Sequence, residues 1–470
     1  MKSNQILKAC FYVILSGLLW SCDKDDEMDP VVEPPVVPEN TLETEINGWI
    51  RAVMNEVYYW NENMRTPIAA TSEPEDYYES LLFRPTDRFS AIYPDYQELI
   101  NNLSGISLDA GYEYTLYRAS STSDDVVAEI SYVKKNSPAA TEGLRRGDVI
   151  TAINGTVMNI DNYRTVLGRT ESTHTISYIR FNESEGGYQA QADISLTPVQ
   201  LSENPIFLDT VFNVDSEKIG YVIYNFFAPD AGNGDKAFDN ELDAAFASFK
   251  AQQINHLIVD FRYNGGGLVS SAVNMASLIA PAVTDEDIFS KTKYNDFIST
   301  NIPELSNVQT AFKTKAENLG ATLEGNRVYI ITSSRTASAS ELIINGLRPY
   351  MDVFLVGDVT YGKNVGSIPF EDEENDDNNY GLLPIVTRSF NSLDESDYIN
   401  GFEPNVEAFE YEERLRPLGD INEYLLRTTI EQITGTASSA RIEKLDRVDI
   451  GSTLDNKIRQ GRMIESNPFK

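Results

Sequence analysis

The stretch that decides the fold is residues 328–347, Val-Tyr-Ile-Ile-Thr-Ser-Ser-Arg-Thr-Ala-Ser-Ala-Ser-Glu-Leu-Ile-Ile-Asn-Gly-Leu. Its first five residues are β-branched or aromatic and mostly apolar, which predicts a buried strand. A short polar loop follows, and the apolar residues after Ser338 predict a helix. A strand, a loop and a helix in this order indicate an α/β protein.

The same alternation continues on both sides of this stretch. Apolar runs predict strands at 219–224, 257–260 and 353–356, and helical spacing predicts helices at 238–249 and 269–280. Because strands and helices alternate along the chain, we expect an α/β core over residues 199–436.

Ser338 is a candidate nucleophile at the start of the helix. A serine hydroxyl needs a base to take its proton, and the chain has only two histidines, so Lys363 is the better candidate base. Two alternatives remain open. Ser338 and Glu341 also form the sequence pattern of a helix capping box, and Ser340 competes as nucleophile.

A glycine-rich turn at 260–267, Asp-Phe-Arg-Tyr-Asn-Gly-Gly-Gly, follows the strand at 257–260. Glycines let the backbone approach a substrate closely. We therefore expect the N–H groups of Gly266 and Gly267, together with that of Ala339 at the helix start, to stabilise an oxyanion. A tight turn is the alternative interpretation of the glycines.

Residues 104–198 contain short strands around the pattern Ser-Pro-Ala (137–139), Gly-Leu (143–144), Gly-Asp-Val-Ile (147–150) and Asn-Gly (154–155). This block resembles a PDZ domain of the bacterial protease type. The resemblance implies a carboxylate-binding loop at Gly105, Ile106, Ser107 and Leu108, whose backbone N–H groups capture the end of a peptide. Ser107 stands where a second glycine is often found. A purely structural lid is the alternative role.

Together these motifs resemble the C-terminal processing (tail-specific) peptidase family, and residues 401–405, Gly-Phe-Glu-Pro-Asn, match a further motif of that family. The resemblance implies a crotonase-like β/α superhelix for the protease core, with no metal or organic cofactor. It also implies Ser338 as nucleophile, Lys363 as general base and an acyl-enzyme intermediate. Ser367 stands where many members carry a glutamine that orients the lysine, so it is the candidate third residue.

The beginning of the chain has the features of an export signal. Residues 1–22 combine a basic start, a short apolar run and Leu-Trp-Ser-Cys, which resembles a lipobox that ends at Cys22. We expect lipidation of Cys22 and an outer-membrane lipoprotein that faces the periplasm or the cell surface. An ordinary cleaved signal is the alternative. Residues 23–42, acidic and Pro-rich, predict an extended linker, and residues 43–103 predict an N-terminal helical domain.

The net charge and the few cysteines and histidines limit the partners and metal sites that we expect. The formal net charge of −34 disfavours nucleic acid, because a polyanion would be repelled. With Cys10 and Cys22 as the only cysteines and two isolated histidines, we expect neither a disulfide framework nor a zinc site. The acidic loop at 370–379 could supply calcium ligands, but a solvated insertion is the favoured interpretation. The tail at 437–470 is either poorly ordered or docked on the core.

The sequence therefore predicts a serine endopeptidase that acts on unfolded or C-terminally exposed polypeptides, with a PDZ domain that selects or gates substrates. Two alternatives come from other classes: a catalytically inactive PDZ-bearing scaffold lipoprotein, and an acyl hydrolase that acts on small thioesters.

Overall fold

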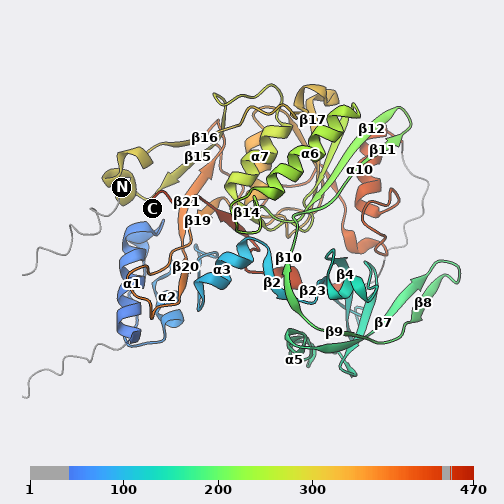
Figure 1. Cartoon of the computed structure of the whole chain (residues 1–470), viewed down its shortest axis with the longest axis horizontal. Coiled ribbons are helices and arrows are strands. Elements are labelled where there is room, and N and C mark those ends of the chain that lie inside the picture. Colours follow the sequence, from blue (N-terminus) through green and yellow to red (C-terminus); the bar gives the residue numbers. More distant parts are fainter. Residues whose placement is uncertain (1–41, 437–444, 446, 470) are drawn as a thin grey trace, which may run out of the picture.

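The computed structural model describes residues 42–436, 445 and 447–469. The expected signal peptide, the lipidation site at Cys22 and residues 23–41 of the linker lie outside this part of the chain. The described residues form a mixed α/β core, a PDZ domain and an N-terminal helical unit (Figure 1), which confirms the expected fold class.

The core is built on a six-stranded sheet with the strand order β11-β12-β13-β17-β18-β22. The strands are β11 (Ile206–Val214), β12 (Glu217–Tyr224), β13 (His256–Asp260), β17 (Arg327–Thr332), β18 (Asp352–Gly357) and β22 (Val406–Glu407). Strands β12 to β22 are parallel, and β11 is antiparallel to β12. The central strands are almost entirely apolar because both faces of the sheet are covered.

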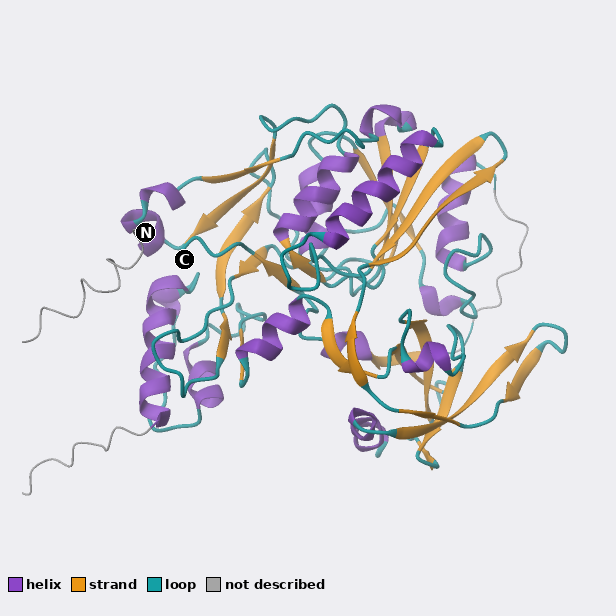
Figure 2. Ribbon diagram, in the orientation of Figure 1, coloured by secondary structure: helices purple, strands orange, loops and turns teal. Residues whose placement is uncertain are grey.

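Helices cover the two faces, as Figure 2 shows. One face packs against α6 (Ala237–Ala251), α7 (Val269–Ile279) and α9 (Ala339–Leu347). The other face packs against α10 (Tyr424–Thr434). Since α9 follows β17 directly, its first residue lies at the carboxyl end of the parallel strands, where open α/β sheets place their ligands.

A second six-stranded sheet lies next to this end, in the order β14-β24-β19-β21-β15-β16. Its strands are β14 (Gly266–Leu268), β24 (Arg462–Ile464), β19 (Val365–Ser367), β21 (Ile385–Phe390), β15 (Ile288–Tyr294) and β16 (Val308–Ala311). Strand β24 comes from the end of the chain and pairs with both β14 and β19. The C-terminal segment is therefore part of the sheet that carries the glycine-rich turn.

The PDZ sheet has the order β23-β3-β4-β5-β7-β8. Its strands are β23 (Val448–Ser452), β3 (Tyr112–Arg118), β4 (Val126–Val133), β5 (Val149–Ile153), β7 (His174–Asn182) and β8 (Gly187–Ala190), with β6 (Thr156–Val157) beside β5 and β9 (Ile194–Leu196) beside β7. Two short helices accompany it, α4 (Pro138–Thr141) and α5 (Tyr163–Leu167). An antiparallel ribbon of β2 (Ile106–Asp109) and β10 (Val199–Ser202) joins this domain to the rest.

The N-terminal unit contains α1 (Leu42–Val57), α2 (Pro74–Leu81) and α3 (Tyr96–Leu103). Its strand β1 (Ala91–Tyr93) pairs with β20 (Gly381–Leu383) of the core, and α8 (Asp296–Asn301) belongs to the core insertion that follows β15. None of the described helices is both long and apolar enough to cross a membrane. Of the tail at 437–470, the described part docks, because β23 joins the PDZ sheet and β24 joins the core.

Candidate active site

Ser338 immediately precedes α9 and is fully buried. Its φ of 65° lies in the left-handed region that a residue with a side chain rarely adopts. Its hydroxyl oxygen has no hydrogen-bond partner among the described residues. A strained backbone and a free hydroxyl at a helix N-terminus are features of a functional serine rather than a capping one.

Glu341 connects the serine to the lysine. Its carboxylate accepts hydrogen bonds from the backbone N–H groups of Ser338 (2.7 Å), Gly362 (2.7 Å) and Lys363 (2.9 Å), and from the Thr360 hydroxyl (2.6 Å). Only the glutamate half of the capping box is therefore used. Burial raises the pKa of Glu341 to about 7, although the four hydrogen bonds oppose this shift by favouring the ionised form.

Lys363 lies in the loop between β18 and β19 and is fully buried. Desolvation, and then the positive charge of Arg462, hold the pKa of its amine well below the usual value for lysine. The amine donates a hydrogen bond of 2.6 Å to the carbonyl oxygen of Gly461 and lies 5.1 Å from the centre of the Phe89 ring. A buried amine with a lowered pKa is suited to accept a proton.

The glycine-rich turn lies against the serine. A Cβ on Gly266 would lie only 2.8 Å from the Cβ of Ser338, and Gly266 and Gly267 have φ values of 108° and 138°. The N–H of Gly266 donates to Asn264 Oδ1 at 2.9 Å, so that amide is already engaged. Ala339 is the first residue of α9, where N–H groups have no partner within the helix. Gly266 and Ala339 thus lie beside Ser338, whereas Gly267 packs against the backbone of Phe227.

The other predicted site residues behave differently. Ser367 lies buried in β19, and its hydroxyl has no hydrogen-bond partner in the described chain, so it does not orient Lys363 here. The Gly461 carbonyl contacts the amine instead. Ser340, the competing nucleophile, donates its hydroxyl proton to the Asn264 carbonyl at 3.1 Å and is a packing residue in this structure.

Sequence reasoning missed two contributions to the lysine pocket. Phe89 comes from the N-terminal unit, where the neighbouring Arg88 donates to the Gly362 carbonyl at 3.1 Å. Gly461 and Arg462 come from the C-terminal segment. No local motif marks either segment, because both reach the site only through tertiary packing.

The expected carboxylate-binding loop of the PDZ domain needs correction. Ile106, Ser107 and Leu108 lie in strand β2, where Ser107 faces Leu201 and Leu108 faces Gln200 of β10. Gly105 accepts a hydrogen bond from Glu203 N–H and packs against the Phe226 ring. These residues therefore form a paired strand instead of an open loop, because the chain that leaves the PDZ domain pairs with the chain that enters it.

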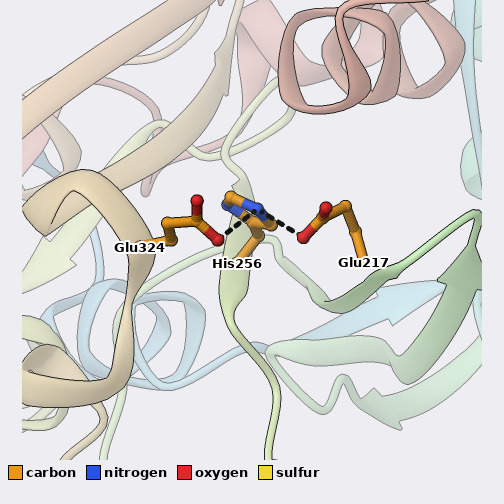
Figure 3. A group of neighbouring side chains, drawn as sticks. All are labelled: Glu217, His256 and Glu324. Carbon is orange, nitrogen blue, oxygen red and sulfur yellow. Dashed lines mark hydrogen bonds and ion pairs between the residues drawn. The ribbon is translucent and has the colours of Figure 1, made fainter.

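A second cluster lies at the opposite, amino-terminal end of the parallel strands, where Glu217, His256 and Glu324 approach one another (Figure 3). His256 Nε2 lies 3.1 Å from Glu217 and 3.9 Å from Glu324. The other ring nitrogen, Nδ1, is buried without a partner. A metal on Nε2 would force the proton onto Nδ1, where no described acceptor meets it, and metal-binding histidines usually donate this second N–H. The cluster fits a hydrogen-bonded group at the amino-terminal ends of the strands better than a metal centre. The sequence predicts that His256 is isolated, but in the structure it contacts Glu217 and Glu324.

Comparison with known proteins places the site in a family context. The profile of peptidase family S41 matches residues 218–408, that of the S41 N-terminal domain matches residues 45–91, and that of a PDZ domain matches residues 129–180. The first match includes Ser338 and Lys363, and the second lies in the N-terminal helical unit. The third match lies in the PDZ sheet, from β4 to β7.

Individual relatives agree. The chain is 25% identical over 235 residues to a CtpA-like serine protease of Staphylococcus aureus strain N315, covering 49% of this chain and 40% of that protein. It is 24% identical over 250 residues to the carboxyl-terminal-processing protease of Picosynechococcus, covering 52% and 53%. The chain thus spans about half or less of these curated relatives. A crystal structure assigned to the S41 proteases, from Bacteroides fragilis NCTC 9343, superposes with a TM-score of 0.68 at 27% identity, covering 83% of this chain and 98% of that one.

Proposed function

Because this chain belongs to peptidase family S41, we propose that it is a serine endopeptidase that cleaves polypeptides with Ser338 and Lys363. One observation supports this most strongly. Ser338 has a hydroxyl without a hydrogen-bond partner in the described chain, and Lys363 has a buried amine of lowered pKa. The backbone N–H groups of these two residues donate to the same carboxylate, that of Glu341.

The chemistry follows from these groups. The neutral amine of Lys363 takes the proton of the Ser338 hydroxyl while its oxygen attacks the carbonyl carbon of the scissile peptide bond. The tetrahedral intermediate collapses, the C–N bond breaks, and the Lys363 ammonium returns the proton to the leaving nitrogen. Water then attacks the acyl-enzyme, Lys363 takes one of its protons, and Ser338 leaves with that proton restored.

Charge develops on the substrate oxygen during both attacks. We expect the N–H of Ala339 at the α9 N-terminus to stabilise this charge, together with the N–H groups of Gly266 and Gly267 once that of Gly266 is released from Asn264. Donors fixed in advance stabilise such charge strongly, and loss of one donor lowers kcat by roughly 100- to 1,000-fold in known hydrolases.

The direct test compares cleavage of fluorescently labelled casein, an unfolded protein, by the wild type, Ser338→Ala, Lys363→Ala and Ser340→Ala. We expect the first two variants to lose cleavage, whereas Ser340→Ala keeps at least a substantial part of it. Absence of casein cleavage by the wild type as well as by Ser338→Ala would favour the catalytically inactive scaffold, and equal cleavage by both would exclude Ser338 as the nucleophile. Hydrolysis of a small acyl thioester, without cleavage of casein, would favour the thioester hydrolase.

The proposal extends to substrate selection and location. The PDZ domain would capture extended, unfolded or C-terminally exposed polypeptides, because PDZ domains bind an extended chain as an added strand of their sheet. Lipidation of Cys22 would anchor the enzyme to the outer membrane, on the periplasmic or the surface side. Membrane fractionation of the wild type and Cys22→Ala tests this part, since the variant should move to the soluble fraction. Retention of the variant in the membrane would contradict it.

A further inference from the structure

Strand β3 of the PDZ sheet would be an edge strand if the chain ended at residue 436. It is covered instead by β23, which comes more than 300 residues later and pairs with it in antiparallel register, from Val448 opposite Arg118 to Ser452 opposite Thr115. Addition of an extended segment to a sheet edge is the way in which PDZ domains bind peptides. The segment of residues 447–464, here named the C-terminal strap, thus occupies this edge in the manner of a peptide.

Side chains of the strap fit the edge. The Ile450 side chain packs against the hydrophobic core of the PDZ domain. Tyr163 and Leu167 of α5 pack against the same core. At the start of the strap, Arg447 forms an ion pair with the buried carboxylate of Glu129 on β4. The surface on β3 and β4 therefore holds an extended segment with a basic residue and, three positions later, an apolar one.

Further basic residues of the strap bind acids that are buried, as are Glu113 and Glu203, or partly buried, as is Asp109. Lys457 lies 2.8 Å from Glu113 and 3.0 Å from Asp109, and Arg459 lies 2.5 Å from Glu203. The strap thus binds through charge complementarity. This matters in a chain of net charge −34, because the strongly acidic protein attracts basic extended segments.

The same strap enters the active site. The Gly461 carbonyl accepts the hydrogen bond of the Lys363 amine at 2.6 Å, and β24 runs parallel to β14, with Arg462 opposite Gly266 and Met463 opposite Gly267. The loop before Ser338 is held too, because Arg335 pairs with Asp455 at 2.8 Å and with Asp449 at 3.4 Å.

In this arrangement a substrate cannot react. Ser338 and Lys363 are both completely shielded from solvent. The described side chains make no hydrogen bond to the Ser338 hydroxyl, and the Lys363 amine is bound to the strap. For catalysis the amine must point its lone pair at the hydroxyl, and a polypeptide must reach the turn at Gly266.

We propose that the C-terminal strap is a built-in occupant of the peptide-binding edge, and that an extended polypeptide with a basic residue three positions before an apolar one displaces it from β3 and thereby releases Lys363 from Gly461. Only the second part of this inference, the release of Lys363 for catalysis, rests on the proposed peptidase function. Capture of the peptide at β3 requires no chemistry.

The first experiment measures capture in the full-length Ser338→Ala protein, which cannot cleave. The probe is a fluorescein-labelled peptide that copies residues 445–460, Leu-Asp-Arg-Val-Asp-Ile-Gly-Ser-Thr-Leu-Asp-Asn-Lys-Ile-Arg-Gln, and the readout is fluorescence anisotropy. Adding Ile450→Asp to the protein should weaken its own strap and tighten peptide binding at least tenfold. Val448→Asp is the matched control, because the Val448 side chain is exposed on the same strand.

Specificity and folding are checked in the same assay. A peptide with Asp at the position of Ile450 or Glu at that of Arg447 should bind at least tenfold more weakly. Arg447→Glu in the protein gives a second way to loosen the strap if Ile450→Asp does not fold. Unchanged affinity in both loosened variants, with β3 amides equally protected from hydrogen exchange, would overturn capture at β3.

The second experiment restores Ser338 and measures casein cleavage. Ile450→Asp and Arg447→Glu should raise the initial rate at least threefold over the wild type, whereas Val448→Asp should leave it within twofold. Wild-type rates in the loosened variants, despite tighter peptide binding, would overturn the link between the strap and Lys363. If no variant cleaves casein, the peptidase function fails and the coupling fails with it, but the binding results still decide capture at β3.

Discussion

At the scale of single residues, Glu341 is the side chain that links the segments carrying Ser338 and Lys363. Its carboxylate binds the backbone N–H groups of Ser338 and Lys363 at once, and also that of Gly362. It touches no reacting atom in this structure, so it is a positioning residue. The backbones of Ser338, the proposed nucleophile, and Lys363, the proposed base, are thus held by one carboxylate.

Glu341→Gln should therefore damage the site while the fold survives. The amide keeps one acceptor oxygen but turns its NH2 group toward backbone donors, and a buried donor left unpaired costs about 1–3 kcal/mol. We expect a loss of unfolding free energy of that size in urea and at least a tenfold fall in kcat with little change in KM. Asp239→Asn, at a buried carboxyl in α6, is the control and should keep the wild-type kcat. A wild-type kcat in Glu341→Gln would contradict the positioning role.

The buried amine of Lys363 makes both activity and stability depend on pH. Its pKa is lowered in the folded chain, so between that value and about 10.4 the unfolded chain binds a proton that the folded chain does not. The free energy of unfolding therefore rises with pH across this window, by up to about 1.4 kcal/mol per pH unit from this group. The kcat/KM should rise as the pH passes upward through the lowered pKa of the folded chain and level off above it, because only the neutral amine accepts the serine proton.

Urea unfolding at pH 7, 8, 9 and 10 checks the stability half of this prediction. Lys363→Met removes the titrating amine, so its unfolding free energy should rise less steeply with pH than that of the wild type, and the variant should be inactive at every pH. Lys250→Met, at an exposed lysine of α6, controls for the loss of a lysine. Parallel slopes for the wild type and Lys363→Met would show that the amine does not titrate as proposed.

At the scale of elements, β14 tolerates nothing larger than glycine at position 266. A Cβ there would lie 2.2 Å from the Arg462 carbonyl oxygen of β24 and 2.8 Å from the Cβ of Ser338, and φ is 108°. Gly266→Ala should therefore lose more than the roughly 1–2 kcal/mol that a left-handed backbone alone costs, and it should abolish cleavage. Gly325→Ala is the control, because φ is 66° there but the space around it is open. If Gly266→Ala and Gly325→Ala lost similar amounts of unfolding free energy in urea, and both cleaved casein at the wild-type rate, position 266 would not be as crowded as described.

The elements also show how far sequence reasoning reached. The strand, loop and helix at 328–347 follow from hydrophobic pattern, and β17 and α9 lie there. The motif at 401–405 was recognised without a role. The structure supplies one, because Phe402 N–H donates to the Thr360 hydroxyl, which in turn donates to Glu341. Such a relay joins residues distant in sequence, so no local pattern reveals it.

Two parts of the site were not predictable for the same physical reason. The family resemblance predicts that Ser367, four positions after Lys363, orients the lysine. The Lys363 amine donates instead to the carbonyl of Gly461, almost 100 residues away. The PDZ loop at Gly105 was inferred from its sequence alone, yet pairing with β10 makes residues 106–109 a strand. Backbone groups carry no side-chain signature, and their partners are set by tertiary packing.

At the scale of the whole molecule, the PDZ domain is fastened to the core by a buried charge network. Arg146 of the PDZ domain lies 2.7 Å from Glu410 and 3.4 Å from Glu423, and its side chain is 6% exposed. Arg262, from the glycine-rich turn, binds Glu423 at 2.6 Å and Glu410 at 2.9 Å. One pair of carboxylates is thus shared between the domain that would receive the peptide and the turn that would receive the oxyanion.

Arg146→Met should loosen this junction. Removing one member of a buried ion network leaves an uncompensated charge and costs about 3–5 kcal/mol, and here the cost falls on the contact between domains. We expect urea unfolding to split from one transition into two, with the PDZ domain released first. Arg327→Met is the matched control, because its pair with Asp352 is exposed on both sides, and such pairs contribute about 0–1 kcal/mol. If Arg146→Met unfolds in one transition at the midpoint of the control, the charge network does not hold the two domains together.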